Sequence, residues 1–196
     1  EVARNLREIA HEQLEFRELL IQMTRRDLQL RYKQTMIGCG WAVFMPLLNT
    51  LIFSTIFTRI APIKTDVPYP LFAFCGLVVW NLTASALRFS TASLTSNSNL
   101  VTKVRFPREI FPFSAVIVSV VDSIIGFILL GCFTAYYGIW PTSAIVMLPL
   151  IVLVHVAFTS ALALLLAMGN LFYRDVKYLA EVAITIWMFA SSVVYP

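Results

Sequence analysis

Three ionisable side chains stand inside long, otherwise uncharged stretches of this sequence: Asp122, His155 and Glu181. A carboxylate inside a membrane is costly unless it is paired, hydrated or protonated. Asp122 is therefore interpreted either as a polar point on a translocation path or as a hydrogen bond that fixes two helices. His155, among Val, Ala and Phe, is more typical of a neutral structural hydrogen bond than of a proton carrier. Glu181 is expected to pair with a nearby basic residue or to face water.

Motifs for catalysis and nucleotide binding are missing from the sequence. It contains no HExxH, no DxxD pair, no Ser/His/Asp trio and no GxxxxGK[ST] phosphate-binding loop. Cys39, Cys75 and Cys132 each fall in an apolar run without CxxC spacing, which favours small buried apolar side chains over a metal site or disulfides. We therefore predict no catalytic residue, no metal site and no bound cofactor, and ATP binding by the usual loop is excluded.

The composition is that of a membrane protein. Of 196 residues, 59% are hydrophobic and 13% charged, and the mean hydropathy is +0.78; a soluble domain has about 25% charged residues. Apolar runs of about 18 or more residues are long enough to cross a bilayer as helices. The sequence predicts an all-α polytopic helix bundle with about five spans, at residues 36–58, 69–87, 113–135, 143–169 and 178–195.

Residues 1–34 are predicted to form an amphipathic helix ahead of the membrane domain at 35–196. Acidic residues come first and basic residues last, an order that suits the helix dipole. Such a helix either lies in the membrane interface or packs on another protein. One apolar face is expected to hold Phe16, Leu19, Leu20, Met23 and Leu30.

Basic residues predict the orientation of the spans. The N-terminal segment and the loops after spans two and four hold thirteen Lys and Arg, whereas the two opposite loops hold two. By the positive-inside rule the N-terminus is cytoplasmic. The loop at about 94–112 has a Ser/Asn turn cluster and then a short amphipathic stretch with Lys103 and Arg105, ended by Pro107. This stretch suits docking to a soluble partner or contact with anionic lipid.

Four motifs, in order along residues 16–196, resemble those of polysaccharide-export ABC transporter permeases (ABC-2 type), in particular the O-antigen exporters of Gram-negative bacteria. They are Arg31-Tyr-Lys-Gln-Thr35 with Gly38, Trp41 and Pro46-Leu47; Asn99-Leu-Val-Thr-Lys-Val-Arg-Phe-Pro-Arg-Glu109; Asn170-Leu-Phe-Tyr-Arg-Asp-Val176; and Ser191-Ser-Val-Val-Tyr-Pro196. In the last motif Ser192 stands where the family usually has proline.

The resemblance implies a non-catalytic permease subunit in the bacterial inner membrane. It implies six spans per permease, so this chain is expected to stop before a re-entrant segment and the last span. It also implies a homodimer above two separate ATPase subunits, which bind ATP and Mg²⁺ and drive export of a lipid-linked polysaccharide such as O-antigen. The expected partners are thus the ATPase, a second copy, the polymer and membrane lipid, with no nucleic acid.

The resemblance and the charges together assign roles to named residues. The residues expected to couple to the ATPase are Asn99, Leu100, Lys103, Arg105 and Arg108; those for the lipid pyrophosphate at the interface are Arg25, Arg26, Arg31 and Lys33; those on the translocation path are Asp122 and Trp41; and those in a further cytoplasmic loop are Arg174 and Asp175. Alternatives are an ABC permease for teichoic acid, capsule polymer or a drug, a membrane-embedded enzyme acting on lipid-linked sugars, and a purely structural subunit.

Overall fold

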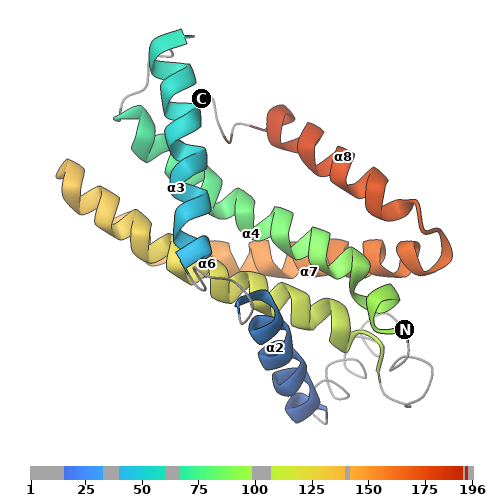
Figure 1. Ribbon diagram of the computed structural model, residues 1–196. Helices are drawn as coiled ribbons and strands as arrows, with labels where there is room; N and C mark the ends of the chain where they lie inside the picture. Colours follow the sequence, from blue (N-terminus) through green and yellow to red (C-terminus); the bar gives the residue numbers. More distant parts are fainter. Residues whose placement is uncertain are drawn as a thin grey trace.

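A computed structural model of the chain describes residues 16–32, 40–60, 67–98, 107–139, 142–191 and 193. All regular secondary structure in these residues is helical, as predicted (Figure 1). The elements are α2 (Arg17–Tyr32), α3 (Gly40–Thr55), the π-helix η1 (Ile56–Ile60), α4 (Tyr69–Ser96), α6 (Ile110–Tyr137), the 3-10 helix η2 (Ser143–Met147), α7 (Leu148–Phe172) and α8 (Val176–Ala190).

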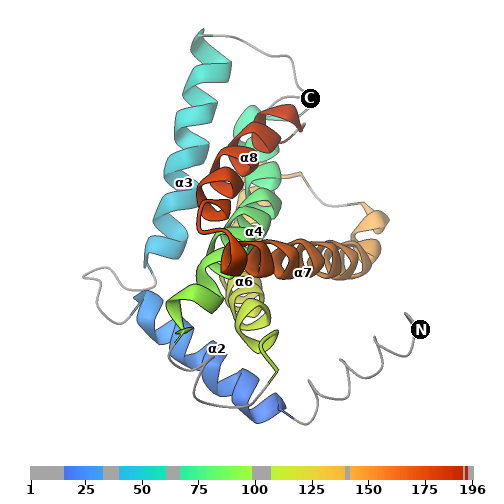
Figure 2. The ribbon, with the colours of Figure 1, turned by 90° about the vertical axis from the view of Figure 1, so that its right-hand side faces the viewer.

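Helix α4 is the centre of the bundle and contacts α3, α6, α7 and α8. Figure 2 shows α3 on one side of α4 and α7 on the other. Most side chains of α4 are buried, whereas few of those of α3 and α7 are, although these two helices are also apolar. Exposed apolar helix surfaces around a buried central helix are what a lipid environment accommodates.

Small residues let α7 approach α4 closely. The buried residues of α7 are Thr159, Ala163, Ala167 and Asn170. Their spacing of four, four and three residues places them on one face of the helix. Helices in lipid gain little from apolar burial, so close contact through small side chains is the main source of their packing energy.

Within the residues that the structure describes, four helical segments are long and apolar enough to cross a membrane: Gly40–Arg59, Tyr69–Ser96, Ile110–Tyr137 and Ile145–Phe172. Each overlaps one of the first four predicted spans. Helix α4 runs nine residues beyond the predicted end of its span at Leu87, because hydropathy marks the apolar part of a helix and not its end. The fifth predicted span, 178–195, overlaps α8, which begins two residues earlier, has 15 residues and extends about 22 Å.

Two glycines are required by the backbone. Gly138 has a φ of +66° and ends α6, where its N–H and that of Ile139 donate to carbonyls of the last turn. This is the turn position where glycine is favoured. Gly76 lies where the segment after α8 crosses α4, and a Cβ there would overlap the carbonyl oxygen of Val193.

Helix α2 lies at one end of the bundle and packs on α6 (Figures 1 and 2). Met23 reaches the buried cluster of Leu94, Phe111 and Ala167, as its place on the predicted apolar face requires. Leu30 is 68% exposed, so that face is not buried along its whole length. The end of α2 near Tyr32 is held by polar contacts instead.

Candidate functional site

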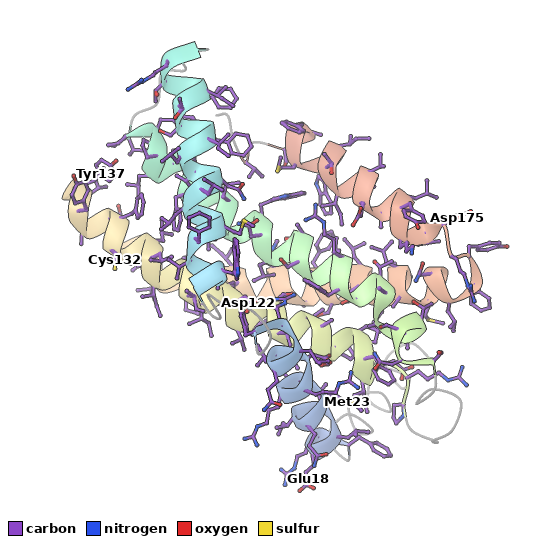
Figure 3. The ribbon with its side chains drawn as sticks, in the orientation of Figure 1. Glu18, Met23, Asp122, Cys132, Tyr137 and Asp175 are labelled. Carbon is purple, nitrogen blue, oxygen red and sulfur yellow. The ribbon has the colours of Figure 1, made fainter. Side chains whose placement is uncertain are left out.

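Asp122 is joined to α2 by an ion pair. The guanidinium Nη1 of Arg31 contacts Asp122 Oδ2, and the Tyr32 hydroxyl donates to Asp122 Oδ1 over 2.5 Å. Figure 3 shows Asp122 on α6, where the end of α2 meets the bundle. The side chains of Arg31 and Asp122 are 18% and 21% exposed. The carboxylate is therefore paired and hydrogen-bonded, which a charge in apolar surroundings requires.

The Arg31 guanidinium also lies over the Phe89 ring of α4, with 3.9 Å between its central carbon and the ring centroid. Attraction to the ring adds to the pairing with Asp122. Burial lowers the pKa of Arg31, while Tyr32 and Asp27 raise it. The guanidinium nevertheless stays charged, because arginine is not deprotonated in proteins. The ion pair thus ties α2 to α6 and places the cation against α4.

Asp27 makes a second link between α2 and α6. Its Oδ2 accepts a hydrogen bond from Ser114 Oγ of α6 at 2.9 Å, and its Oδ1 accepts from Arg26 at 2.8 Å. Met23, Asp27 and Arg31 are spaced by four residues and so share one face of α2. Sequence reasoning missed Asp27 and Tyr32. The i, i+4 spacing of Asp27 with Met23 and Arg31 was the signal that could have identified Asp27.

Two cavities adjoin the ion pair. The first, of about 190 Å³, lies between α3, α4 and α6 and includes Asp122, Tyr32 and Trp41 in its wall. The second, of about 420 Å³, lies between α2, α4 and α6 and includes Arg26, Asp27 and Arg31. Because Asp122 lines one cavity and Arg31 the other, the ion pair stands between them. Asp122 and Trp41, both predicted for the translocation path, share the first cavity.

The predicted basic cluster at the interface is partly neutralised. Arg31 is paired with Asp122 and Arg26 with Asp27, whereas Arg25 is exposed. Lys33 lies outside the described residues. Among the predicted coupling residues Arg108 is exposed just before α6, while Asn99, Leu100, Lys103 and Arg105 lie outside the described residues.

The ends of α4, α6 and α7 are joined by hydrogen bonds at one end of the bundle. Ser90 Oγ donates to the Pro112 carbonyl at 3.1 Å, and the Asn170 amide donates to the Thr91 carbonyl at 2.9 Å. Asp175 lies in the turn between α7 and α8 (Figure 3). At these helix ends the exposed charged residues include Arg108, Arg174 and Asp175.

His155 and Glu181 lie apart from the Asp122 site. His155 Nε2 is 2.7 Å from Thr83 Oγ1, a hydrogen bond between α7 and α4. Glu181 is exposed on α8 and shares a shallow hollow with Arg88 and Lys177. The three ionisable residues therefore lie in different surroundings on different helices. The His155 bond fits the structural role expected from its apolar surroundings.

Comparison with known proteins identifies the family. The family model for ABC-2 type transporters matches residues 18–196. The chain is 31% identical over 189 residues to the O-antigen export system permease protein RfbA of Myxococcus xanthus, an alignment that covers 96% of this chain and 72% of that protein. It is 30% identical over 180 residues to the protein of the same name in Klebsiella pneumoniae, covering 91% and 69%. The chain, with its multi-pass apolar helices and its site around Asp122, belongs to the ABC-2 type transporter family of membrane transport subunits.

Proposed function

We propose that this chain is the permease subunit of an ABC transporter that exports an O-antigen-type, lipid-linked polysaccharide across a bacterial inner membrane. The observation that carries the proposal is the alignment over 96% of the chain with a protein named as an O-antigen export permease. The sequence has no phosphate-binding loop, so ATP and Mg²⁺ would be held by a separate ATPase subunit. A second copy of the chain would complete the permease.

The proposed orientation has the N-terminus and the ends of α4, α6 and α7 near Ser96, Ile110 and Phe172 in the cytoplasm, because basic residues gather there. Tyr136 and Tyr137, at the other end of α6, would then lie at the outer interface, where aromatic rings are favoured. From there a hydrocarbon layer of about 30 Å takes in about 20 residues of α6. This places Asp122 about 8 Å inside the cytoplasmic edge.

At that depth Asp122 is within reach of a helix that lies in the membrane interface. Helix α2 supplies Arg31 and Tyr32 to it from outside the bundle. Movement of α2 would therefore act directly on α6, without passing through a loop. We assign α2 the role of transmitting motion of the ATPase to the spans, with the Arg31–Asp122 pair as its attachment point.

The ATPase would dock at the ends of α4, α6 and α7 that are joined by hydrogen bonds. Arg108, Arg174 and Asp175 offer exposed charges there. The loop between α4 and α6, with Asn99, Leu100, Lys103 and Arg105, would complete the docking surface. For the lipid pyrophosphate, Arg25 is the one of the predicted arginines that is exposed on α2, and Lys33 follows the helix in the sequence. Arg26 and Arg31 are already paired, which leaves them less charge to offer an anion.

The test uses the organism's own cells and the full-length protein. Cells that lack this gene should lose their surface polysaccharide, and should regain it with a plasmid copy. Tagged protein should co-purify with an ATPase subunit, and Arg108→Glu should weaken that co-purification while leaving the amount of permease in the membrane unchanged. Unchanged surface polysaccharide in the deletion strain would point to another cargo, and purification with no ATPase would refute the permease assignment.

A further inference from the structure

The cavity between α3, α4 and α6 has several polar side chains in its wall, although all three helices are apolar enough to cross a membrane. Its wall holds the Asp122 carboxylate, the side-chain amides of Asn49 on α3 and Asn81 on α4, and the hydroxyl groups of Ser85 and Ser123. Polar side chains within spans are rare and face the interior or a cavity. Here they converge on one space from three helices.

Some of these polar groups have no partner in the protein. Within the part of the chain that the structure describes, the side chains of Asn49, Asn81 and Ser85 make no hydrogen bond. An amide in apolar surroundings costs free energy unless its donors and acceptors are satisfied. The two amides can each donate two hydrogen bonds and accept two. An occupant with both hydrogen-bond donors and hydrogen-bond acceptors would therefore satisfy these side chains.

The charge and shape of the cavity narrow the choice of occupant. Asp122, already paired with Arg31, is the one charged side chain among the described residues that line it; no basic side chain among them lines the wall, so an anion would be buried there without a counter-charge. Trp41 contributes a flat apolar surface beside the polar groups. A volume of about 190 Å³ corresponds to roughly six water molecules, a space comparable with one sugar ring. A sugar ring has apolar C–H faces and hydroxyl groups at its edge, which match this wall.

We propose that this cavity binds one neutral sugar ring, with its hydroxyl groups hydrogen-bonded to Asn49, Asn81 and Asp122 and one ring face against Trp41. The inference rests on the proposed function, because export of a polysaccharide is what brings sugar rings to the bundle. It adds to that function a site for a single ring within one copy of the chain. A ring carrying a carboxylate or phosphate would be disfavoured, because no basic side chain among the described residues lines the cavity to pair with it.

Cysteine protection tests the site. The full-length protein, with its native cysteines replaced by serine, carries Ser85→Cys and is placed in lipid nanodiscs. Labelling by a small uncharged thiol reagent is timed with and without methyl glycosides of neutral hexoses. A glycoside at ten times its dissociation constant leaves about one site in ten free, so labelling should slow about tenfold. The methyl glycoside of a hexuronic acid, matched in size but anionic, should not protect.

Two further variants separate binding from indirect effects. Ser96→Cys lies on the same helix but lines the second cavity, so its labelling should be unaffected by the glycosides. Asn81→Leu, of similar size but without the amide, should abolish protection at Ser85→Cys. Equal slowing at both cysteines, no slowing with any neutral glycoside, or a Ser85→Cys that the reagent never reaches would each overturn the proposal. The last two results would mean a cavity that holds water only or is closed to solutes.

Export in cells is scored separately with the wild-type protein. Export of polysaccharide without protection at Ser85→Cys would remove the sugar site and leave the proposed function intact. Protection without export would refute the proposed function and leave a sugar-binding cavity to be explained. The two failures are therefore distinguishable.

Discussion

Removal of the Asp122 carboxylate should loosen α2 from the bundle by a measurable amount. Asp122→Ala leaves the Arg31 guanidinium unpaired beside α6, and breaking one partner of a fully buried ion pair costs about 3–5 kcal/mol. Both side chains are about a fifth exposed, so water compensates in part and we expect about 2–3 kcal/mol. Asp122→Asn keeps an acceptor without the charge. Its cost should be about half as large, because charge-assisted hydrogen bonds are roughly twice as strong as neutral ones.

The assay is thermal unfolding of the full-length protein in detergent. For a chain of this size 1 kcal/mol shifts Tm by roughly 2–4 °C, so Asp122→Ala should lower Tm by roughly 4–12 °C. Arg31→Ala, combined with Asp122→Ala in a double-mutant cycle, should give a coupling energy of about 0.5–3 kcal/mol. Asp175→Asn removes an exposed carboxylate from the α7–α8 turn and serves as the matched control, with an effect within about 0.5 kcal/mol.

Additive costs for Arg31→Ala and Asp122→Ala would refute this reasoning. Independent side chains give ΔΔG values that add within about 0.5 kcal/mol, whereas an ion pair cannot be broken twice. A shift for Asp122→Ala no larger than that for Asp175→Asn would also refute it, since the carboxylate would then contribute nothing to holding α2.

The remaining predictions concern single contacts. Gly76→Ala should lower the Tm of the full-length protein, because a Cβ there meets the backbone of the segment after α8, whereas Gly131→Ala, which meets nothing within 4 Å, should leave it unchanged or raise it slightly. Thr83→Val removes the hydroxyl bonded to His155 and should cost about 0.6 kcal/mol while export in cells continues, as a structural hydrogen bond requires; loss of export at normal protein levels would contradict that role. Tyr32→Phe removes the 2.5 Å hydrogen bond to the Asp122 carboxylate and should lower the free energy of unfolding by about 1.5–3 kcal/mol. An unchanged free energy of unfolding would contradict this prediction.

The helices could be predicted from sequence because lipid leaves the backbone few choices. A spanning segment must satisfy its own N–H and C=O groups, so an uncharged run of sufficient length becomes a helix. The four long helices follow from that rule. The continuation of α4 to Ser96 could not be read from hydropathy, because its last residues are polar. Helix α8 belongs to an apolar run of sufficient length, and its 15 residues show that such a run does not by itself fix the length of a helix.

The Asp122 site could be predicted only in part. An isolated carboxylate in an apolar run marked Asp122 as a residue that needs a partner. The partner, Arg31, is 91 residues away in the chain, and its charge alone predicts only that it attracts an anion. Charge clusters indicate attraction to any opposite charge, and only the fold decides that the nearest one is internal. The cavity with its polar side chains could likewise not be predicted from the sequence, because Asn49 and Asn81 are on different helices and share no motif.

Because Asp122 both holds α2 and lines the polar cavity, its two roles should be coupled. Arg31 and Tyr32 occupy one oxygen each, and a carboxylate has about four acceptor positions in all. Arg31→Ala frees one oxygen of the Asp122 carboxylate and leaves the negative charge of that carboxylate uncompensated. A sugar hydroxyl should therefore bind more tightly to Asp122. A gain of about 1.4 kcal/mol would lower by about tenfold the glycoside concentration that protects Ser85→Cys.

Linkage makes the coupling reciprocal: if loss of the α2 contact strengthens sugar binding, sugar binding must weaken the α2 contact by the same factor. Saturating glycoside should therefore reduce the double-mutant coupling energy between Arg31 and Asp122. Equal protection in wild-type and Arg31→Ala backgrounds would show that the carboxylate serves α2 alone. In that case the cavity and the attachment of α2 would be independent features that share one residue.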